Sequence, residues 1–387
     1  MNFDFDQPID RRGSHALKFD GRRQKFGSGD VSPLWVADMD FAAPPCAVEA
    51  LQERARHPIY GYTQYPASLL DALTGWCLRR HGWHVEPDWL VPASGVLAAL
   101  SAAMQACTGL GDAVIVQPPV YPGFFRAVED AGRRLRHNPL RETSGRYAMD
   151  LAQLEQQARD GARALLLCNP HNPGGRAWSP DELGEVLRIA RRHDLTVIAD
   201  EVHGDLALPG FRHCPLGRMA QADDRVISVL SPSKAFNLQG LGLSMLATAR
   251  EDLRAALRKS VVAAHLGDAN PFAAAAAEAA WREGDAWLDA LKRYLGGTRD
   301  FVAGFLREQL PVIRMEPPQA GYLLWLDCRG LGMDDSALRD FFVHRCKLGL
   351  NPGNEFGPGG SGFMRMNIGT PRRNIEAALE AIEAALA

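Results

Sequence analysis

Short apolar runs alternate with amphipathic stretches through the middle of the chain, from about residue 44 to residue 240. Continuous runs of this kind are typical of strands that are covered on both faces. They occupy residues 113–117, 164–168, 196–200 and 225–230. Between them, residues 179–193 begin with serine, proline and acidic side chains, which together make a good helix start. The alternation predicts βαβ units and a largely parallel sheet.

The last third of the chain has a different pattern. Residues 250–310 are alanine-rich and helical in character, residues 321–327 resemble a strand, and a terminal helix is expected after Pro371. With 387 residues, the chain is long enough for two cores. We therefore expect an α/β protein with two domains. The large domain comprises residues 46–274, and a smaller α+β domain comprises residues 1–45 and 275–387.

Composition excludes several classes of partner. Hydrophobic residues make up 46% of the chain and charged residues 23%, and the net charge of −3 offers no general attraction for nucleic acid or acidic membranes. The acidic start at residues 1–6 does not resemble a signal peptide, and no apolar run is long enough to cross a bilayer. Seven scattered cysteines without Cys-x-x-Cys pairing favour reduced thiols over disulfides or a metal site. We expect a cytoplasmic protein without nucleic-acid, membrane or metal partners.

The most informative stretch is residues 231–241, SPSKAFNLQGL, where Lys234 lies among hydroxyl groups directly after a predicted strand. Burial at a strand end disfavours the charged ammonium, so it lowers the pKa of the lysine until the neutral amine can form a Schiff base. Lys234 is therefore a candidate carrier of pyridoxal phosphate.

Polar or aromatic residues also follow other predicted strands. Asp200 ends its strand, where a carboxylate can keep a cofactor's pyridine nitrogen protonated or can simply cap the next helix. Asn172, in the sequence NPHNP, can donate to a phenolic oxygen or form part of a rigid turn. Tyr121 can stack on a cofactor ring or belong to the core.

Two further segments have binding chemistry. Ser94, Gly95 and Val96 follow a short strand and open a helix, where free amides can meet a phosphate at the positive end of the helix dipole. Arg365 lies inside the apolar run 363–368 and needs a partner there. That partner is either a substrate carboxylate held by both guanidinium nitrogens or an internal acidic side chain.

The order of these motifs resembles the fold type I pyridoxal-phosphate enzymes, the aspartate aminotransferase superfamily, from about Val31 to Arg372. The resemblance implies a mostly parallel seven-stranded sheet sandwiched by helices, beside a smaller α+β domain. It makes Lys234 the Schiff-base lysine, Asp200 the partner of the pyridine nitrogen and Arg365 the clamp on the substrate's α-carboxylate.

The same resemblance assigns the rest of the cofactor site. Asn172 would bind the phenolic oxygen and Tyr121 would stack on the ring. The phosphate would be surrounded by Ser94, Gly95, Val96, Ser231 and Ser233. A homodimer is also implied, with Tyr62 of the neighbouring subunit reaching the phosphate; Tyr60, two positions away, is the alternative.

Three features of the sequence indicate which branch of the superfamily the chain resembles. Position 242, eight after the lysine, is Gly242 where aminotransferases commonly carry a phosphate-binding arginine. Position 203 is His203 in place of the usual tyrosine, and it can still reach the phenolic oxygen of the cofactor. Three segments are similar to the cystathionine β-lyase branch of MalY/PatB type: WVADMDF at residues 35–41, NPHNP at residues 169–173, and residues 231–241. Asp38, from the first of these segments, joins Arg365 and Tyr121 as a predicted substrate-binding residue.

The resemblance implies a C–S β-lyase that cleaves L-cystathionine or related S-substituted cysteines to a thiol, pyruvate and ammonia by α,β-elimination. Lys234 is the expected base, and Asp200 and Tyr121 are further expected catalytic residues. The alternative is a class I/II aminotransferase, which uses nearly the same residues. A ligand-sensing protein without activity would be marked by loss of Lys234 or Asp200 or by an added DNA-binding domain, and the sequence has neither mark.

Overall fold

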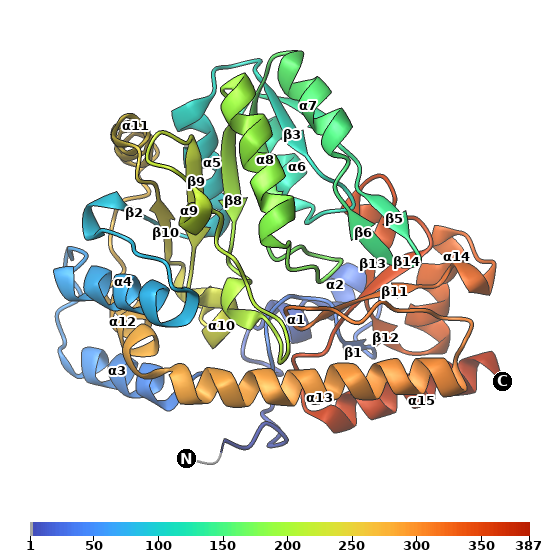
Figure 1. Cartoon of the computed structure of the whole chain (residues 1–387). Coiled ribbons are helices and arrows are strands. Elements are labelled where there is room, and N and C mark those ends of the chain that lie inside the picture. The colour runs from blue at the N-terminus through green and yellow to red at the C-terminus, as the bar shows by residue number, and fades with distance from the viewer. Residues whose placement is uncertain (1–2) are drawn as a thin grey trace.

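A seven-stranded sheet lies at the centre of the protein, in a computed structural model that describes residues 3–387 (Figure 1). The first two residues of the predicted N-terminal arm lie outside the described residues. In order across the sheet, the strands are β2 (Leu90–Ala93), β10 (Ser244–Ala247), β9 (Val226–Leu230), β8 (Thr196–Asp200), β7 (Ala162–Cys168), β3 (Ala113–Val116) and β4 (Arg134–His137). Strand β10 is antiparallel to both of its neighbours, and the other pairs are parallel. The expected mostly parallel seven-stranded sheet is confirmed.

Helices cover both faces of this sheet because its strands are apolar on both sides. Alternate strand residues point to opposite faces, so Val114 packs in one core cluster while Ile115 packs in another. One face is covered by α5 (Val96–Cys107), α6 (Gly123–Asp130) and α11 (Glu251–Ala263). The other is covered by α7 (Leu151–Arg159), α8 (Pro180–His193) and α9 (Leu216–Met219).

Helix α8 begins where its sequence predicts. Ser179 accepts a hydrogen bond from the amide of Glu182 over 3.2 Å, and the Glu182 carboxylate accepts one from the amide of Ser179 over 2.8 Å. This reciprocal capping satisfies two amide groups that the first turn of a helix leaves free. The cap fixes the end of the loop that leads from β7 and carries Asn172.

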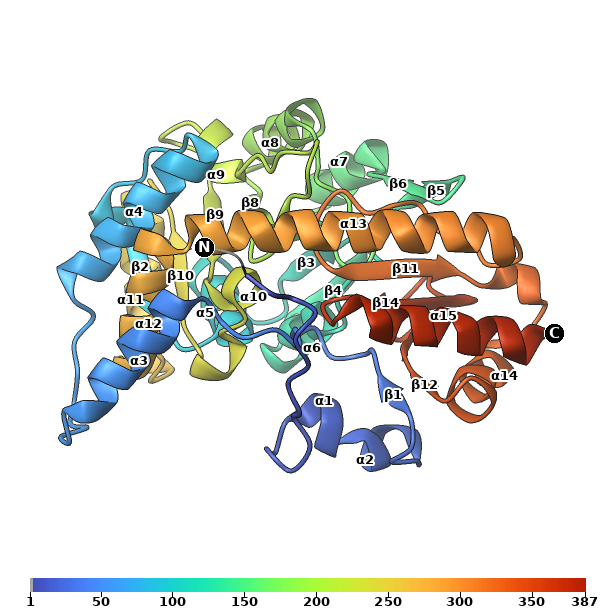
Figure 2. The ribbon, with the colours of Figure 1, turned by 90° about the horizontal axis from the view of Figure 1, so that it is seen from below.

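Long helices and a smaller sheet lie along one edge of the large sheet. Helices α3 (Pro45–Arg56) and α4 (Ala67–His81) both pack against α12 (Pro271–Glu283). Helix α13 (Asp285–Gln309) runs from there towards a three-stranded antiparallel sheet, with α15 (Arg372–Leu386) beside it (Figure 2). That sheet consists of β11 (Leu323–Asp327), β14 (Phe363–Asn367) and β13 (Asn351–Pro352), in that order.

The remaining short elements belong mainly to the two ends of the chain. In the N-terminal arm, α1 (Leu17–Asp20) and α2 (Arg22–Phe26) precede β1 (Ser32–Pro33), which pairs in parallel with β12 (Leu348–Gly349). Others are the hairpin β5 (Arg141–Thr143) and β6 (Arg146–Ala148), α10 (Ser233–Phe236) and α14 (Asp335–Asp340). The arm thus contacts the C-terminal third, but the domain boundaries at residues 46 and 274 stay a prediction. No helix within residues 3–387 is both long and apolar enough to cross a membrane.

Candidate active site

A cavity of about 460 Å³ opens at the carboxyl ends of the parallel strands. Parallel strands bring the residues that follow them to the same edge of a sheet, which is where α/β proteins bind ligands. Ten of the predicted residues line this cavity: Ser94, Gly95, Val96, Tyr121, Asn172, Asp200, His203, Ser231, Ser233 and Lys234. The structure therefore gathers in one place residues that are up to 140 positions apart (234 − 94) in the sequence.

Lys234 lies on the short helix α10, directly after β9, and its amine is held at the cavity wall. Its Nζ donates a hydrogen bond to the carbonyl oxygen of Ala37 over 2.7 Å. Burial, followed by the charge of Arg365, lowers the pKa of Lys234 to about 8. A substantial fraction of the amine is therefore neutral near physiological pH, as a nucleophile or a base requires.

Two further titratable residues come from the end of β8. Burial raises the pKa of Asp200 to about 6, against the opposing effects of the Val202 amide, which donates to the carboxylate over 3.2 Å, and of Lys234. The bond to Val202 is local, so the Asp200 carboxylate is partly used as a turn cap and still faces the cavity. Burial lowers the pKa of His203 to about 3, and its imidazole is neutral at physiological pH.

Arg365 is buried in the middle of β14 and has no acidic partner among the described residues. Its Nη1 donates to Asn172 Oδ1 over 3.0 Å, and its Nη2 donates to Asn351 Oδ1 over 2.9 Å and to the carbonyl of Trp35 over 3.0 Å. Its Nε has no partner in the part of the chain that the structure describes. Burial lowers the pKa of Arg365 to about 10. A desolvated guanidinium held only by neutral oxygens is suited to an incoming carboxylate.

Hydroxyl and amide groups also line the cavity. Ser231 donates to the carbonyl of Leu243 over 2.6 Å and lies 2.9 Å from the Ser233 hydroxyl, while Ser94 donates to the carbonyl of Leu266 over 3.1 Å. The amide of Gly95 is not free as expected, because it donates to the carbonyl of Ala93 over 3.0 Å. Gly95, with φ of 90°, instead turns the chain so that α5 starts at the cavity. The amide groups that lack a partner among residues 3–387 are those of Val96, Leu97 and Ala98, at the positive end of α5.

Gly242 also lines the cavity, where an arginine is common in aminotransferases. Its backbone is left-handed, with φ of 68°. Glycine adopts this conformation without strain, whereas an arginine would be strained there even though a Cβ would meet open space. The presence of glycine at position 242 is therefore coupled to the left-handed backbone conformation after α10.

Four predicted residues are not among those that line the cavity. One is Arg365, which contacts the lining residue Asn172. Asp38 is next to Ala37, but its carboxylate is engaged by Arg11 over 2.8 Å. Tyr62 is fully exposed, and Tyr60 is exposed and donates to the carbonyl of Ala55 over 2.8 Å. A substrate role for Asp38 and a cofactor role for either tyrosine stay predictions.

The sequence did not reveal three contributors to the site. Ala37 accepts hydrogen bonds not only from Lys234 but also from Tyr322 Oη over 2.9 Å and from Gln239 Nε2 over 3.3 Å. Gln239 lies within the lysine motif and Ala37 within WVADMDF, so both were inside recognised motifs without an assigned role. Tyr322 precedes a strand by one position and had no local signal, because its contact spans 285 positions.

The donor set fits pyridoxal phosphate. Asn172 uses its side-chain oxygen towards Arg365, which leaves its amide nitrogen to donate to a phenolic oxygen. Asp200 provides a carboxylate for a pyridinium nitrogen, Lys234 an amine for an aldehyde, and the start of α5 free amides for a phosphate. Each functional group of the cofactor thus has a complementary group in one cavity.

The family model for aminotransferase class I and II matches residues 30–382. The chain belongs to this family. Cystathionine beta-lyase PatB of Bacillus subtilis is 42% identical over 99% of each chain, and protein MalY of Escherichia coli is 31% identical over 97% of this chain and 96% of its own. The predicted resemblance is confirmed.

Solved structures that resemble this chain have the same fold. Cystalysin from Treponema denticola, whose crystal structure contains pyridoxal 5'-phosphate, superposes with a TM-score of 0.96 at 33% identity. The match covers 100% of this chain and 99% of cystalysin. The expected fold type is therefore confirmed over the whole chain.

Proposed function

We propose that the protein is a pyridoxal-phosphate-dependent C–S β-lyase that cleaves L-cystathionine or a related S-substituted cysteine. One observation carries the chemistry. Arg365 is a buried guanidinium without an acidic partner within residues 3–387, and it is bonded to Asn172 in the wall of the cavity into which Lys234 places a partly neutral amine. Full-length similarity to a protein named cystathionine beta-lyase supports the choice of reaction.

Arg365 binds the α-carboxylate of the amino acid. Asn172, Asn351 and the Trp35 carbonyl bind both terminal nitrogens and so fix the guanidinium plane, which orients the substrate carboxylate as well as attracting it. Fixing the carboxylate in turn limits where the substrate's Cα can lie. Arg365 is close enough to Lys234 to lower the pKa of its amine, so a carboxylate bound by Arg365 would bring the Cα–H bond towards that amine.

Lys234 is the base that removes the proton from Cα. Its lowered pKa allows it to accept a proton near neutral pH, and the Ala37 carbonyl holds one of its N–H bonds so that the lone pair is directed elsewhere. When bound, pyridoxal phosphate activates the amino acid and takes up the electron pair released at Cα. The Asp200 carboxylate would favour the charged pyridinium that this role needs, and Asn172 and neutral His203 would hold the phenolic oxygen.

The leaving group distinguishes the lyase from the alternative. With a thioether sulfur on Cβ, the electron pair released at Cα forms a Cα–Cβ double bond, and the Cβ–S bond breaks so that the sulfur leaves as a thiolate. Addition of water then gives pyruvate and ammonia, so L-cystathionine and water yield homocysteine, pyruvate and ammonia. In an aminotransferase, the same lysine would deliver its proton to the cofactor instead. Gly242 favours the lyase, because an arginine anchor common in aminotransferases is absent at that position.

The test is to incubate the enzyme with L-cystathionine, with and without a 2-oxo acid, and to measure pyruvate and ammonia. Release of both products without the 2-oxo acid is expected. Strict dependence on the 2-oxo acid, with transfer of the amino group to it, would establish the aminotransferase instead.

We also infer a homodimer in the cytoplasm. Exposed aromatic and aliphatic side chains at Ile59, Tyr60 and Tyr62, close together on the loop before α4, support burial of this loop in an interface. All seven cysteines are unpaired, which supports a reducing compartment.

A further inference from the structure

The segment of residues 35–41, here called the covering segment, lies between the first part of the N-terminal arm, residues 3–34, and the candidate active site. Side chains hold its backbone along almost its whole length. Carbonyl oxygens of residues 35, 36, 37, 38, 39 and 41 each accept a hydrogen bond from a side chain. A segment without regular secondary structure is therefore fixed in position by side chains from distant parts of the chain.

Residues of the site hold the covering segment from one side. Lys234 donates to the carbonyl of Ala37 and Arg365 to that of Trp35. Asn237, three positions after Lys234, accepts a bond from the amide of Met39 over 3.0 Å and donates to the carbonyl of the same residue over 3.0 Å. Any shift of this segment is thus transmitted directly to the amine and the guanidinium.

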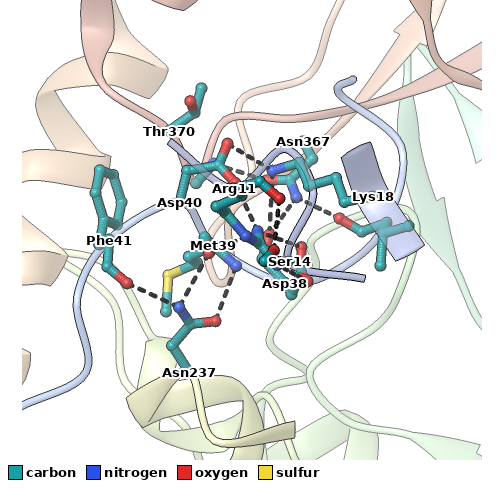
Figure 3. Close-up of polar contacts among 12 residues, drawn as sticks. Arg11, Ser14, Lys18, Asp38, Met39, Asp40, Phe41, Asn237, Asn367 and Thr370 are labelled. Atoms are coloured by element: carbon teal, nitrogen blue, oxygen red, sulfur yellow. Dashed lines mark hydrogen bonds and ion pairs between the residues drawn. The ribbon is translucent and has the colours of Figure 1, made fainter. Parts of the chain in front are cut away.

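Two cations of the arm hold it from the other side (Figure 3). Arg11 Nη1 lies 2.7 Å from Asp40 Oδ1, and Arg11 Nη2 lies 2.8 Å from Asp38 Oδ2. Lys18, from α1, is fully buried and lies 2.9 Å from Asp40 Oδ2. Arg11 also donates to the carbonyl of Met39 over 3.2 Å. The guanidinium therefore connects two carboxylates and the backbone between them.

The four charges of Arg11, Lys18, Asp38 and Asp40 contribute little to the net free energy of unfolding. Desolvation of buried charges offsets most of their attraction, and apolar replacements are often equally stable. An arginine that bridges two carboxylates does, however, fix their relative position with a planar, rigid group. The geometry of the covering segment is thus the property that the cluster determines most directly.

We propose that Arg11, supported by Lys18, is a positioning residue that fixes the carbonyl of Ala37 and through it the amine of Lys234 during removal of the Cα proton. The inference rests on the role of Lys234 as the base in the proposed function. It does not depend on the nature of the leaving group. Misplacement of a reacting group by about 1 Å can cost roughly 100-fold in rate, so a loosened covering segment is expected to slow proton transfer.

Exchange of the Cα proton of L-alanine in heavy water tests the proposal in the cofactor-loaded enzyme. L-alanine has no leaving group on Cβ, so the exchange rate, followed by NMR, reports proton removal alone. Hydrogen–deuterium exchange of the backbone amides of residues 35–41, followed by mass spectrometry, reports the covering segment independently of activity.

Arg11→Gln removes the guanidinium that bridges Asp38 and Asp40, and Arg12→Gln is the matched control. Arg12 is the next residue and is exposed, and among residues 3–387 it pairs only with the exposed Asp10. Arg11→Gln is expected to slow Cα exchange at saturating L-alanine by about tenfold or more, with KM changed by less than about threefold, and to speed amide exchange within residues 35–41. Arg12→Gln is expected to match the wild type in all three measurements.

Arg11→Lys keeps the charge and provides a second variant if the first does not fold. One ammonium cannot bridge both carboxylates in a plane, so a several-fold slower Cα exchange is expected. Wild-type rates in either folded Arg11 variant would overturn the proposal, as would slower rates without a change in the amide exchange of residues 35–41. If the wild-type enzyme itself does not exchange the Cα proton, the role of Lys234 in the proposed function fails instead.

Discussion

Arg365 donates a hydrogen bond to the side-chain oxygen of Asn172 over 3.0 Å, across 193 positions of sequence. This bond couples the expected site for the substrate's carboxylate to the expected site for the cofactor's phenolic oxygen. It also fixes the orientation of the Asn172 amide, because the oxygen is used and only the nitrogen is left to face the cofactor.

Arg365→Lys is expected to raise the KM for the amino acid by about 30-fold or more, because a lysine cannot make the paired bonds of a guanidinium to a carboxylate. KM from initial rates with L-cystathionine is the measurement. Arg329→Lys, at an exposed arginine paired with Asp327, is the control and should leave KM unchanged. An unaltered KM in Arg365→Lys would remove this residue from the substrate site.

Lys234→Ala is expected to lower turnover by at least about 10,000-fold, because it removes both the base and the amine that holds the cofactor. The visible absorbance of the covalently held cofactor should be lost as well, which a spectrum of the purified protein shows. Lys292→Ala is the matched control, since burial also lowers the pKa of Lys292 but this residue does not line the cavity. An unchanged spectrum in Lys234→Ala would contradict the assignment.

The lowered pKa of Lys234 also predicts how the stability of the cofactor-free protein depends on pH. The folded protein releases this proton near pH 8, whereas the unfolded chain keeps it to about 10.5. The buried ammonium of Lys234 therefore lowers the free energy of unfolding by its full amount below pH 8. This destabilisation disappears as the pH rises to 10.5.

Lys234→Met is accordingly expected to melt at a higher temperature than the wild type below pH 8, with a difference that shrinks between pH 8 and 10.5. Thermal melts of the cofactor-free proteins across this range are the measurement. Lys259→Met, at an exposed lysine of α11, controls for the loss of a surface charge. A constant difference at all pH values would show that the amine is not desolvated.

A shared active site predicts that two inactive variants restore each other. In a mixed dimer of Lys234→Ala and Tyr62→Phe subunits, one of the two sites has both Lys234 and Tyr62 intact. Unfolding and refolding the two proteins together should recover about a quarter of the wild-type activity, because half of the dimers are mixed and each has one complete site. If Tyr62→Phe is active by itself, the same experiment with Tyr60→Phe decides between the two tyrosines. No recovery with either would argue against a shared site.

The residues that follow strands were predictable from sequence, and those that act across the fold were not. Asp200, Asn172 and Ser231 each follow an apolar run, and parallel strands bring such positions together. Arg11 and Tyr322 had no comparable signal, because their contacts with the covering segment depend on the path of the N-terminal arm. The amide of Gly95 was assigned to the phosphate because a helix start leaves amides free, but the turn before α5 uses it locally.

The left-handed backbone at Gly242 constrains how this protein can evolve. A single substitution from glycine to arginine would provide the charge that is common in aminotransferases, yet the side chain would start from a strained backbone and in a direction set by that backbone. An arginine at this position would carry a backbone strain of about 1–2 kcal/mol unless a second change reshaped the loop. The gain of this anchor is therefore coupled to the backbone conformation after α10, whereas the two activities share nearly all of their other residues.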